Sequence, residues 1–217
     1  MTNPQTKIVV SDPDEAEIRL RAMGLTEAIL HSALRSGIAG AALCTLNHPT
    51  NFGGLTFWAE ATRWLRETLI PEGWRRDNSY GLPTVVRGDE GLAIAVVRGD
   101  KGTGNPKANP TTQHPRGTVV ISRVEQNGIL PGFEHLKAEQ EQLEAAARVP
   151  MWLLLHYRAG DQLVAELSYP TVINRSGFVE EWAERIILTS IALDPTRMPV
   201  LDEPPVLPDV SVRRRAS

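Results

Sequence analysis

Apolar residues near the start of the chain recur with helical spacing in two short segments. In TEAILHSALRSG an apolar stripe runs from Ile29 to Leu34 along one helix face. Thr26 is placed to cap the start of this helix and Gly37 to end it. The preceding segment DEAEIRLRAMG begins with acidic residues and ends at Gly24, which is typical of a shorter helix. We therefore predict a helical hairpin.

A longer amphipathic pattern follows, and the chain then changes to strand-like patterns. LTFWAEATRWLRETL predicts a helix that Pro71 and Gly73 end. LPTVV and LAIAVV predict two strands joined by a Gly-Asp-Glu-Gly turn, and TVVIS predicts a third strand. LAIAVV is apolar on both of its faces, so we expect it in the middle of a sheet that is covered on both sides.

The C-terminal half continues this alternation of helices and strands. FEHLKAEQEQLEAAARVP predicts a helix closed by Pro150. MWLLLHYR and QLVAELSY predict a second strand hairpin, and SGFVEEWAERIILTS predicts a last helix with Ser176 as its N-cap. The order of elements predicts an α+β fold, in which an N-terminal helical segment is followed by a mixed or antiparallel sheet packed by helices.

The polar character of the two ends sets the expected domain limits. We expect residues 1–12 to be disordered, residues 13–54 to form the helical segment and residues 55–192 to form the α+β domain. Residues 193–217 are rich in proline and end in RRRAS. A segment of that composition cannot bury enough apolar surface to become ordered, so we expect a disordered tail.

Composition narrows the setting in which the protein works. The 217 residues carry a net charge of −3, so no global attraction to nucleic acid or to anionic lipid is expected. The N-terminus lacks the features of a signal peptide, and no apolar run approaches the ~18 residues of a membrane span. Cys44 is the single cysteine and cannot form an internal disulfide. These features predict a cytoplasmic protein without a membrane partner.

The connection RGDKGTGNPKANPTTQHPRG, residues 98–117, is the strongest candidate for a binding surface. It carries four Lys or Arg residues and one Asp, a local charge of +3 in a chain whose total is −3. A glycine-rich turn after a strand can direct backbone N–H groups at an oxyanion, although the phosphate-loop pattern G-x-x-x-x-G-K-[ST] is absent. The other interpretation is a solvated connector between strands. The candidate contacts to nucleic acid or phosphate are Lys101, Lys107 and Arg116, with Trp74, Arg75 and Arg76 as an extension of the same patch.

The register of the second hairpin decides the surroundings of Glu166. A two-residue turn at residues 160–161 places His156 and Glu166 on opposite faces of the sheet, whereas a three-residue loop would place them on one face as a possible dyad. A carboxylate on a covered face needs a partner, because burying an unpaired charge is costly. Arg185 is the candidate partner.

The order of helix, three strands, helix and strand in residues 56–158 resembles the common core of the PD-(D/E)xK nuclease superfamily. This resemblance implies a divalent cation, such as Mg²⁺, that is held by acidic residues and activates water. Residues 83–84 and 96–98 occupy the positions of the family's acids, and neither stretch contains one. The alternative hypothesis is therefore a metal-dependent phosphodiesterase with a degenerate site. Its candidate ligands are Asp89, Asp100 and Glu166.

The strings GW, LAIAV, GDKGTG and PTTQHPRG resemble a group of uncharacterised bacterial proteins associated with plasmids and integrated mobile elements. The resemblance covers roughly residues 25–120. It implies a bacterial intracellular protein, and it indicates no activity, cofactor or site; the oligomeric state stays open. The favoured hypothesis is a non-enzymatic binding module that contacts nucleic acid or a phosphorylated protein partner through residues 98–117. Whether the protein is an enzyme stays open at this stage.

Overall fold

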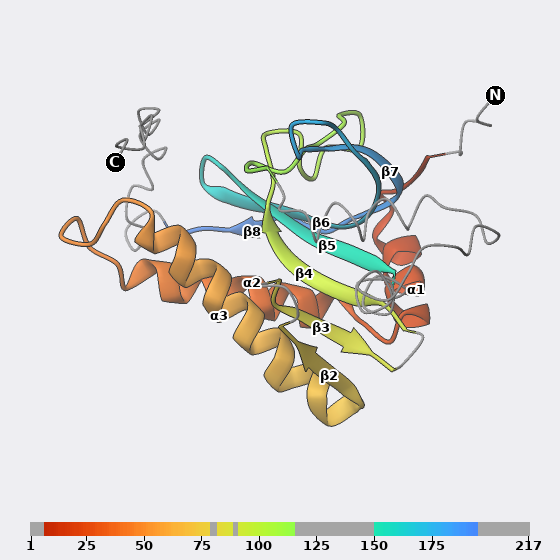
Figure 1. Cartoon of the computed structure of the whole chain (residues 1–217), viewed down its shortest axis with the longest axis horizontal. Helices are drawn as coiled ribbons and strands as arrows, with labels where there is room; N and C mark the ends of the chain where they lie inside the picture. The colour runs from red at the N-terminus through yellow and green to blue at the C-terminus, as the bar shows by residue number, and fades with distance from the viewer. Residues whose placement is uncertain (1–6, 79–81, 89–90, 116–149, 195–217) are drawn as a thin grey trace, which may run out of the picture.

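The computed structural model describes residues 7–78, 82–88, 91–115 and 150–194, and the helices lie in the first of these ranges (Figure 1). Thr26 caps its helix, as predicted, by accepting a hydrogen bond from the Ile29 N–H at 3.2 Å. None of the helices in the described ranges is long and apolar enough to cross a bilayer. The helices are α1 (Pro13–Ala22), α2 (Glu27–Ala42), α3 (Phe52–Leu69) and the short 3-10 helix η1 (Ile70–Glu72).

The prediction that α2 ends at Gly37 is wrong, because the helix continues to Ala42. Gly37 lies in the contact between α2 and α3. A Cβ atom at this position would lie 2.9 Å from the backbone oxygen of Phe57 in α3. The glycine is therefore needed for helix packing, although the same residue type commonly ends a helix.

In the described ranges, the strands form one mixed sheet of eight strands in the order β1-β7-β6-β5-β4-β3-β2, with β8 paired to β6. The pairs β1–β7 and β4–β5 are parallel and the others are antiparallel. The α+β architecture with a mixed sheet is thus confirmed. The strands are β1 (Ile8–Val10), β2 (Trp74–Asp77), β3 (Thr84–Arg87), β4 (Ala93–Arg98), β5 (Met151–Ala159), β6 (Gln162–Ile173), β7 (Val179–Ile187) and β8 (Ile191–Ala192).

The central position predicted for LAIAVV is confirmed, since β4 lies between β3 and β5. Ile94 and Val96 belong to the core between the sheet and the helices. Ala95 and Val97 point to the opposite face and belong to a second buried cluster. Successive residues of a strand alternate between faces, so a strand covered on both sides has to be apolar throughout.

Two expectations for the ends of the sheet are wrong. The disorder predicted for residues 1–12 does not hold for Ile8–Val10, which form β1 and pair with β7; Val10 is 1% exposed. The last predicted helix is strand β7, and its Trp182 donates a hydrogen bond to the Pro110 carbonyl at 2.9 Å. Val179, Trp182 and Ile186 have helix-like spacing, but register shifts in the β6–β7 pairing interrupt the normal alternation of a strand. The predicted strand TVVIS and the helix before Pro150 lie outside the described residues.

The connection after β4 forms turns with internal hydrogen bonds in residues 99–115, and it is partly buried and partly exposed. The Asp100 carboxylate accepts hydrogen bonds from the N–H groups of Gly102 and Thr111, at 3.0 and 3.1 Å. The Thr111 hydroxyl donates to the Val179 carbonyl at 2.8 Å. Gly102 and Thr112 are buried. These contacts attach the connection to the face of the sheet opposite α2 and α3, where Val179 and Trp182 are buried.

Candidate functional site

The predicted patch of six residues is divided by the fold. Trp74 is 4% exposed and belongs to the core beneath the helices, so the prediction that it is free to stack on a base is wrong. Arg75 and Arg76 follow it on β2 and are exposed. As neighbours in a strand, they point to opposite faces of the sheet.

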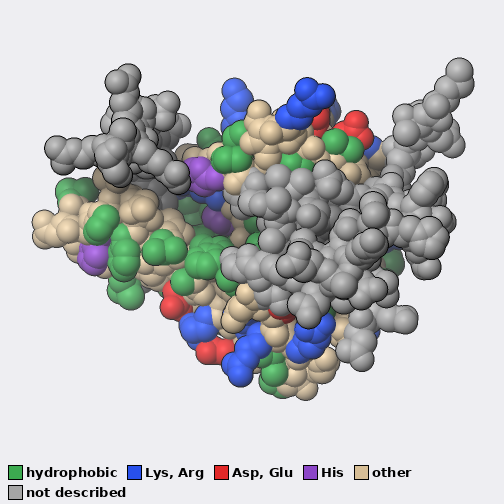
Figure 2. Space-filling view, in the orientation of Figure 1, with side chains coloured by type: hydrophobic (Ala, Val, Ile, Leu, Met, Phe, Trp, Pro, Cys, Tyr) green, Lys and Arg blue, Asp and Glu red, His purple; other side chains and the backbone are tan. Residues whose placement is uncertain are grey.

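The basic residues of the connection lie far from β2. Lys101 and Lys107 are exposed on residues 99–115, which lie at the top of the view in Figure 1, while β2 lies at the bottom. Figure 2 likewise shows Lys and Arg side chains at the top and at the bottom of this face, with other side chains between them. Arg116 lies outside the described residues. The described candidates therefore do not form one surface.

Glu166 has the structural role that the sequence suggested. The two-residue turn and its register are confirmed, with Glu166 opposite Leu155 and His156 opposite Ala165, so His156 and Glu166 do not form a dyad. Glu166 is 0% exposed and forms the predicted ion pair with Arg185. The Arg185 Nε donates to Glu166 Oε1 at 2.9 Å and its Nη2 to Oε2 at 2.5 Å.

The same ion pair holds the connection in place. Arg185 donates to the carbonyls of Ala108 and Asn105, at 2.7 and 3.2 Å. Glu166 accepts from the Gly104 N–H at 2.8 Å and from the Ser168 hydroxyl at 2.7 Å. These partners occupy both carboxylate oxygens of Glu166, which leaves the carboxylate poorly placed to bind a metal.

The other proposed metal ligands do not complete a site. The Asp100 carboxylate is used within its own turn, and Asp89 lies outside the described residues. In the ranges that the structure covers, no group of three His, Cys, Asp or Glu side chains could hold a metal ion. The described geometry therefore offers no support for a Mg²⁺ centre.

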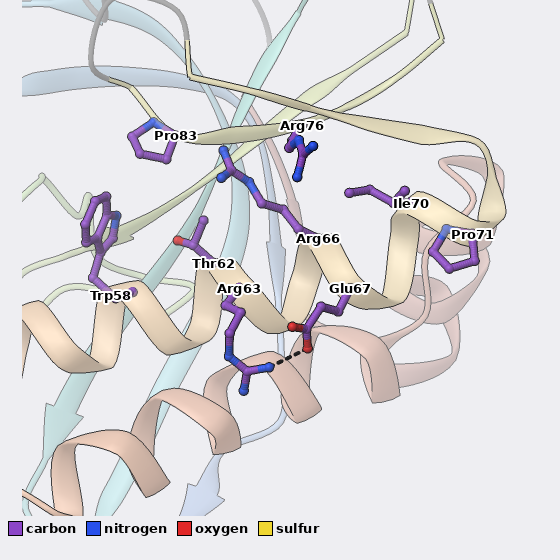
Figure 3. A pocket seen from close by; sticks show the side chains of 10 residues that line it. Trp58, Thr62, Arg63, Arg66, Glu67, Ile70, Pro71, Arg76 and Pro83 are labelled. Atoms are coloured by element: carbon purple, nitrogen blue, oxygen red, sulfur yellow. Dashed lines mark hydrogen bonds and ion pairs between the residues drawn. The ribbon is translucent and has the colours of Figure 1, made fainter.

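A pocket of about 510 Å³ between α3 and the β2–β3 hairpin brings together a different set of side chains (Figure 3). α3 contributes residues one and two helical turns apart, which therefore point the same way. Of the residues predicted to bind phosphate, this pocket contains Arg76 alone among the described ones. The side chains that matter for its chemistry are Trp58, Thr62, Arg66, Arg76 and Pro83.

Arg66 is held in a fixed orientation by neutral oxygen atoms. Its Nε donates to the Thr84 carbonyl at 3.2 Å, and its Nη2 donates to the Asp77 carbonyl at 2.9 Å and to Asn78 Oδ1 at 2.7 Å. Thr84 and Asp77 face each other across the β2–β3 pair. The remaining nitrogen, Nη1, has no hydrogen-bond partner among the described residues. One edge of a preoriented guanidinium is thus available.

Arg76 adds a second positive charge beside Arg66. Burial and, next, repulsion by the Arg76 guanidinium lower the pKa of Arg66 from its ordinary value, and the Asp77 carboxylate opposes this shift. Arg66 still keeps its proton at neutral pH, because an arginine in a protein does not lose it there. Within the part of the chain that the structure describes, the side chain of Arg76 makes no hydrogen bond or ion pair. An anion between the two guanidinium groups would relieve their repulsion.

Thr62 provides a polar group that lacks a partner in the same pocket. The side chain is 8% exposed, and its Oγ1 is buried without a hydrogen bond. Leaving a buried hydroxyl unpaired is unfavourable, so this atom is suited to receive a ligand. Arg63, by contrast, is already neutralised by ion pairs with Glu60, at 2.8 Å, and with Glu67.

Most residues of this pocket were not predicted from the sequence. Trp58, Thr62 and Arg66 have the spacing i, i+4, i+8, which places them along one line on α3. That line borders the apolar stripe of the helix, and tryptophan in such a helix is normally part of the core. The spacing was a usable signal, but it does not show that β2 places Arg76 opposite the same line.

Comparison of the chain with models of protein families, with curated proteins and with solved structures gave no match. The resemblances to the nuclease superfamily and to the mobile-element proteins therefore stay predictions.

Proposed function

We propose that the protein is a non-enzymatic binding module that holds a phosphate-bearing ligand in the pocket between α3 and β2. The observation that carries this proposal is the pair of guanidinium groups of Arg66 and Arg76, which face the pocket and repel each other. Asp77 offsets part of this repulsion electrostatically, and the Glu67 carboxylate of the lining is paired with Arg63. The proposal keeps the binding function predicted from the sequence and moves it from residues 98–117 to this pocket. The cytoplasmic setting expected from the single Cys44 belongs to the same proposal.

Phosphate fits the chemistry of the site better than a single carboxylate does. Arginine offers several donors in a planar fork, which matches the geometry of phosphate oxygens. A phosphate group carries close to two negative charges at neutral pH, enough to balance both arginines. The pocket volume of about 510 Å³ lies within the range typical of small-molecule sites. The ligand is therefore a small phosphorylated molecule or one phosphorylated unit of a larger one.

The first test uses inorganic phosphate and the full-length protein. We expect phosphate to raise the melting temperature in a concentration-dependent way, beyond the effect of sodium chloride at the same ionic strength. Arg76→Gln should weaken this binding by about tenfold or more, the loss expected for a hydrogen bond to a charged group. In the absence of phosphate, the free energy of unfolding of Arg76→Gln should differ from that of the unmodified protein by no more than about 0.5 kcal/mol, as is usual for substitutions at exposed sites.

Arg75→Gln is the matched control. It removes the same charge from the same strand, but on the opposite face of the sheet. We expect it to leave phosphate binding within about twofold of the unmodified protein, since distant surface charges are screened by salt. Equal losses in the two variants, or no phosphate effect on the unmodified protein, would overturn the proposal.

A further inference from the structure

We infer that the ligand is a nucleoside monophosphate unit, with its base against Trp58, its sugar beside Thr62 and its phosphate between Arg66 and Arg76. This inference rests on the proposed function and names the class of ligand for the same pocket. It is based on the order in which the pocket presents an aromatic ring, a free hydroxyl and two positive charges.

The order of these groups follows from the geometry of α3. Trp58, Thr62 and Arg66 are four residues apart, and a helix rises about 1.5 Å per residue, so they stand roughly 6 Å apart along the axis. Figure 3 shows Trp58 at one end of the pocket, Arg66 and Arg76 further along it, and Thr62 between them. A nucleotide carries its base, sugar and phosphate in the same order.

The Trp58 end of the pocket is suited to a flat, uncharged group. Trp58 is half-buried and lines the pocket together with the half-buried Pro83, which lies across from it in Figure 3. A purine or pyrimidine can place its face on an indole ring, and such stacking tolerates any base because each has a π-face. Between Trp58 and Thr62, the residue of α3 that lines the pocket is Ala59. The lining therefore has no charged side chain between these two positions of α3.

Thr62 is placed to receive the sugar. Its Oγ1 is the buried hydroxyl without a partner, and a hydroxyl can both donate and accept a hydrogen bond. A sugar hydroxyl would therefore satisfy it in either direction. Neither inorganic phosphate nor a free base offers a group in this position.

The other end of the pocket limits the number of phosphates. Beyond the two arginines the lining consists of Ile70, Pro71 and the acidic Glu67 (Figure 3). Arg63, the remaining arginine of the lining, is paired with Glu60 and Glu67. Two unpaired positive charges balance one phosphate group. A triphosphate would bring charge that nothing in this lining neutralises, so the site favours a monophosphate.

The experiment compares four probes on the full-length protein by isothermal titration calorimetry: adenosine monophosphate, adenosine, inorganic phosphate and a short single-stranded oligonucleotide. We expect adenosine monophosphate to bind at least about tenfold more tightly than phosphate, since one stacked base contributes this much. Adenosine without phosphate should bind more weakly than the monophosphate. The oligonucleotide distinguishes the source of the unit, because tighter binding than the monophosphate indicates nucleic acid, and weaker binding indicates a free nucleotide.

Two variants test the assigned contacts. Trp58→Leu should reduce adenosine monophosphate binding to about the strength of phosphate binding, without changing phosphate binding itself. Thr62→Val should weaken adenosine monophosphate binding by about threefold to tenfold, the range for one hydrogen bond. Trp64→Leu is the control, since Trp64 is a half-buried tryptophan of the same helix that does not line the pocket. Circular dichroism and melting temperature show that each variant is folded.

The outcomes separate the inference from the proposed function. Equal affinities for adenosine monophosphate and phosphate, both lowered by Arg76→Gln, would overturn the nucleotide inference and leave the phosphate site standing. Loss of nucleotide binding in Trp64→Leu but not in Trp58→Leu would also overturn the inference. If neither phosphate nor nucleotide binds, both proposals fall.

Discussion

The buried ion pair between Glu166 and Arg185 is expected to contribute strongly to stability through the connection that it holds. Arg185→Met keeps a long apolar side chain but removes the guanidinium. Glu166, at 0% exposure, would then keep only the Ser168 hydroxyl and the Gly104 N–H as partners. The carbonyls of Ala108 and Asn105 would also lose their donor.

The expected loss of stability follows from these contacts. Breaking a buried pair by removing one partner costs about 3–5 kcal/mol, because an uncompensated charge remains buried. Each neutral hydrogen bond lost from the connection adds about 1 kcal/mol. We therefore expect Arg185→Met to lower the free energy of unfolding by about 5 kcal/mol. This is a large share of the 5–15 kcal/mol that is typical of a folded domain.

Urea unfolding measures this loss, and hydrogen exchange shows where it acts. Arg185→Met should increase exchange at the Gly104 amide, which bonds to Glu166. The double variant Glu166→Leu/Arg185→Met should recover more than half of the lost stability, because no buried charge is left unpaired. Arg19→Met is the control, since its ion pair with Glu184 at 3.0 Å is partly exposed, and it should cost less than about 1 kcal/mol.

The reasoning would be refuted if Arg185→Met cost no more than Arg19→Met. It would also be refuted if the double variant were as unstable as the single one, since the loss would then not come from an unpaired charge. Unchanged hydrogen exchange at the Gly104 amide would show that the ion pair does not hold the connection in place.

Three further predictions concern the core. Ile94→Asp places a charge at a site that is 1% exposed in the central strand and should unfold the protein, so an unchanged melting midpoint would contradict the architecture. Burial, followed by repulsion from Arg98, lowers the pKa of His156 to about 3. Because the unfolded histidine keeps a pKa near 6.5, stability present above that pH should fall as the pH drops from 6.5 toward 3, by up to about 5 kcal/mol. His156→Phe should reduce this loss when urea midpoints are compared between pH 6.5 and pH 4. Gly37→Ala should destabilise the protein by about 1–3 kcal/mol in the same assay, because its Cβ would meet a backbone oxygen of α3. Gly54→Ala is the control for this substitution, because a Cβ atom at Gly54 in α3 would meet no other atom within 4 Å. It should leave the free energy of unfolding unchanged or raise it by up to about 1 kcal/mol.

Local sequence patterns were sufficient for several elements. The apolar run around Ile94 predicted a central strand, because a strand covered on both faces needs apolar residues at every position. The two-residue turn at residues 160–161 predicted the faces of His156 and Glu166, since each residue along a strand changes face. Thr26 predicted a helix start, because its hydroxyl bonds to the backbone three residues later. In each case the deciding interactions lie within a few residues.

Strand β7 shows how tertiary contacts override a local pattern. VEEWAERII is rich in good helix formers and has apolar residues at helical spacing. The chain instead pairs with β6 on one side and β1 on the other, and Arg185 is buried on Glu166. Sequence reasoning identified Arg185 as the partner but assigned it to a helix, because the need of a buried carboxylate for a cation is independent of secondary structure.

The sequence by itself determined the α+β class, the central strand, the turn at residues 160–161 and the Glu166–Arg185 pair. Only the tertiary structure decided that residues 99–115 fold over this pair, that Trp74 is buried, and that Arg76 lies beside Arg66. The physical reason is one of range. Periodicity and turn chemistry act between neighbours in the chain, whereas the pocket depends on how β2 is placed against α3, which the packing of the whole core sets.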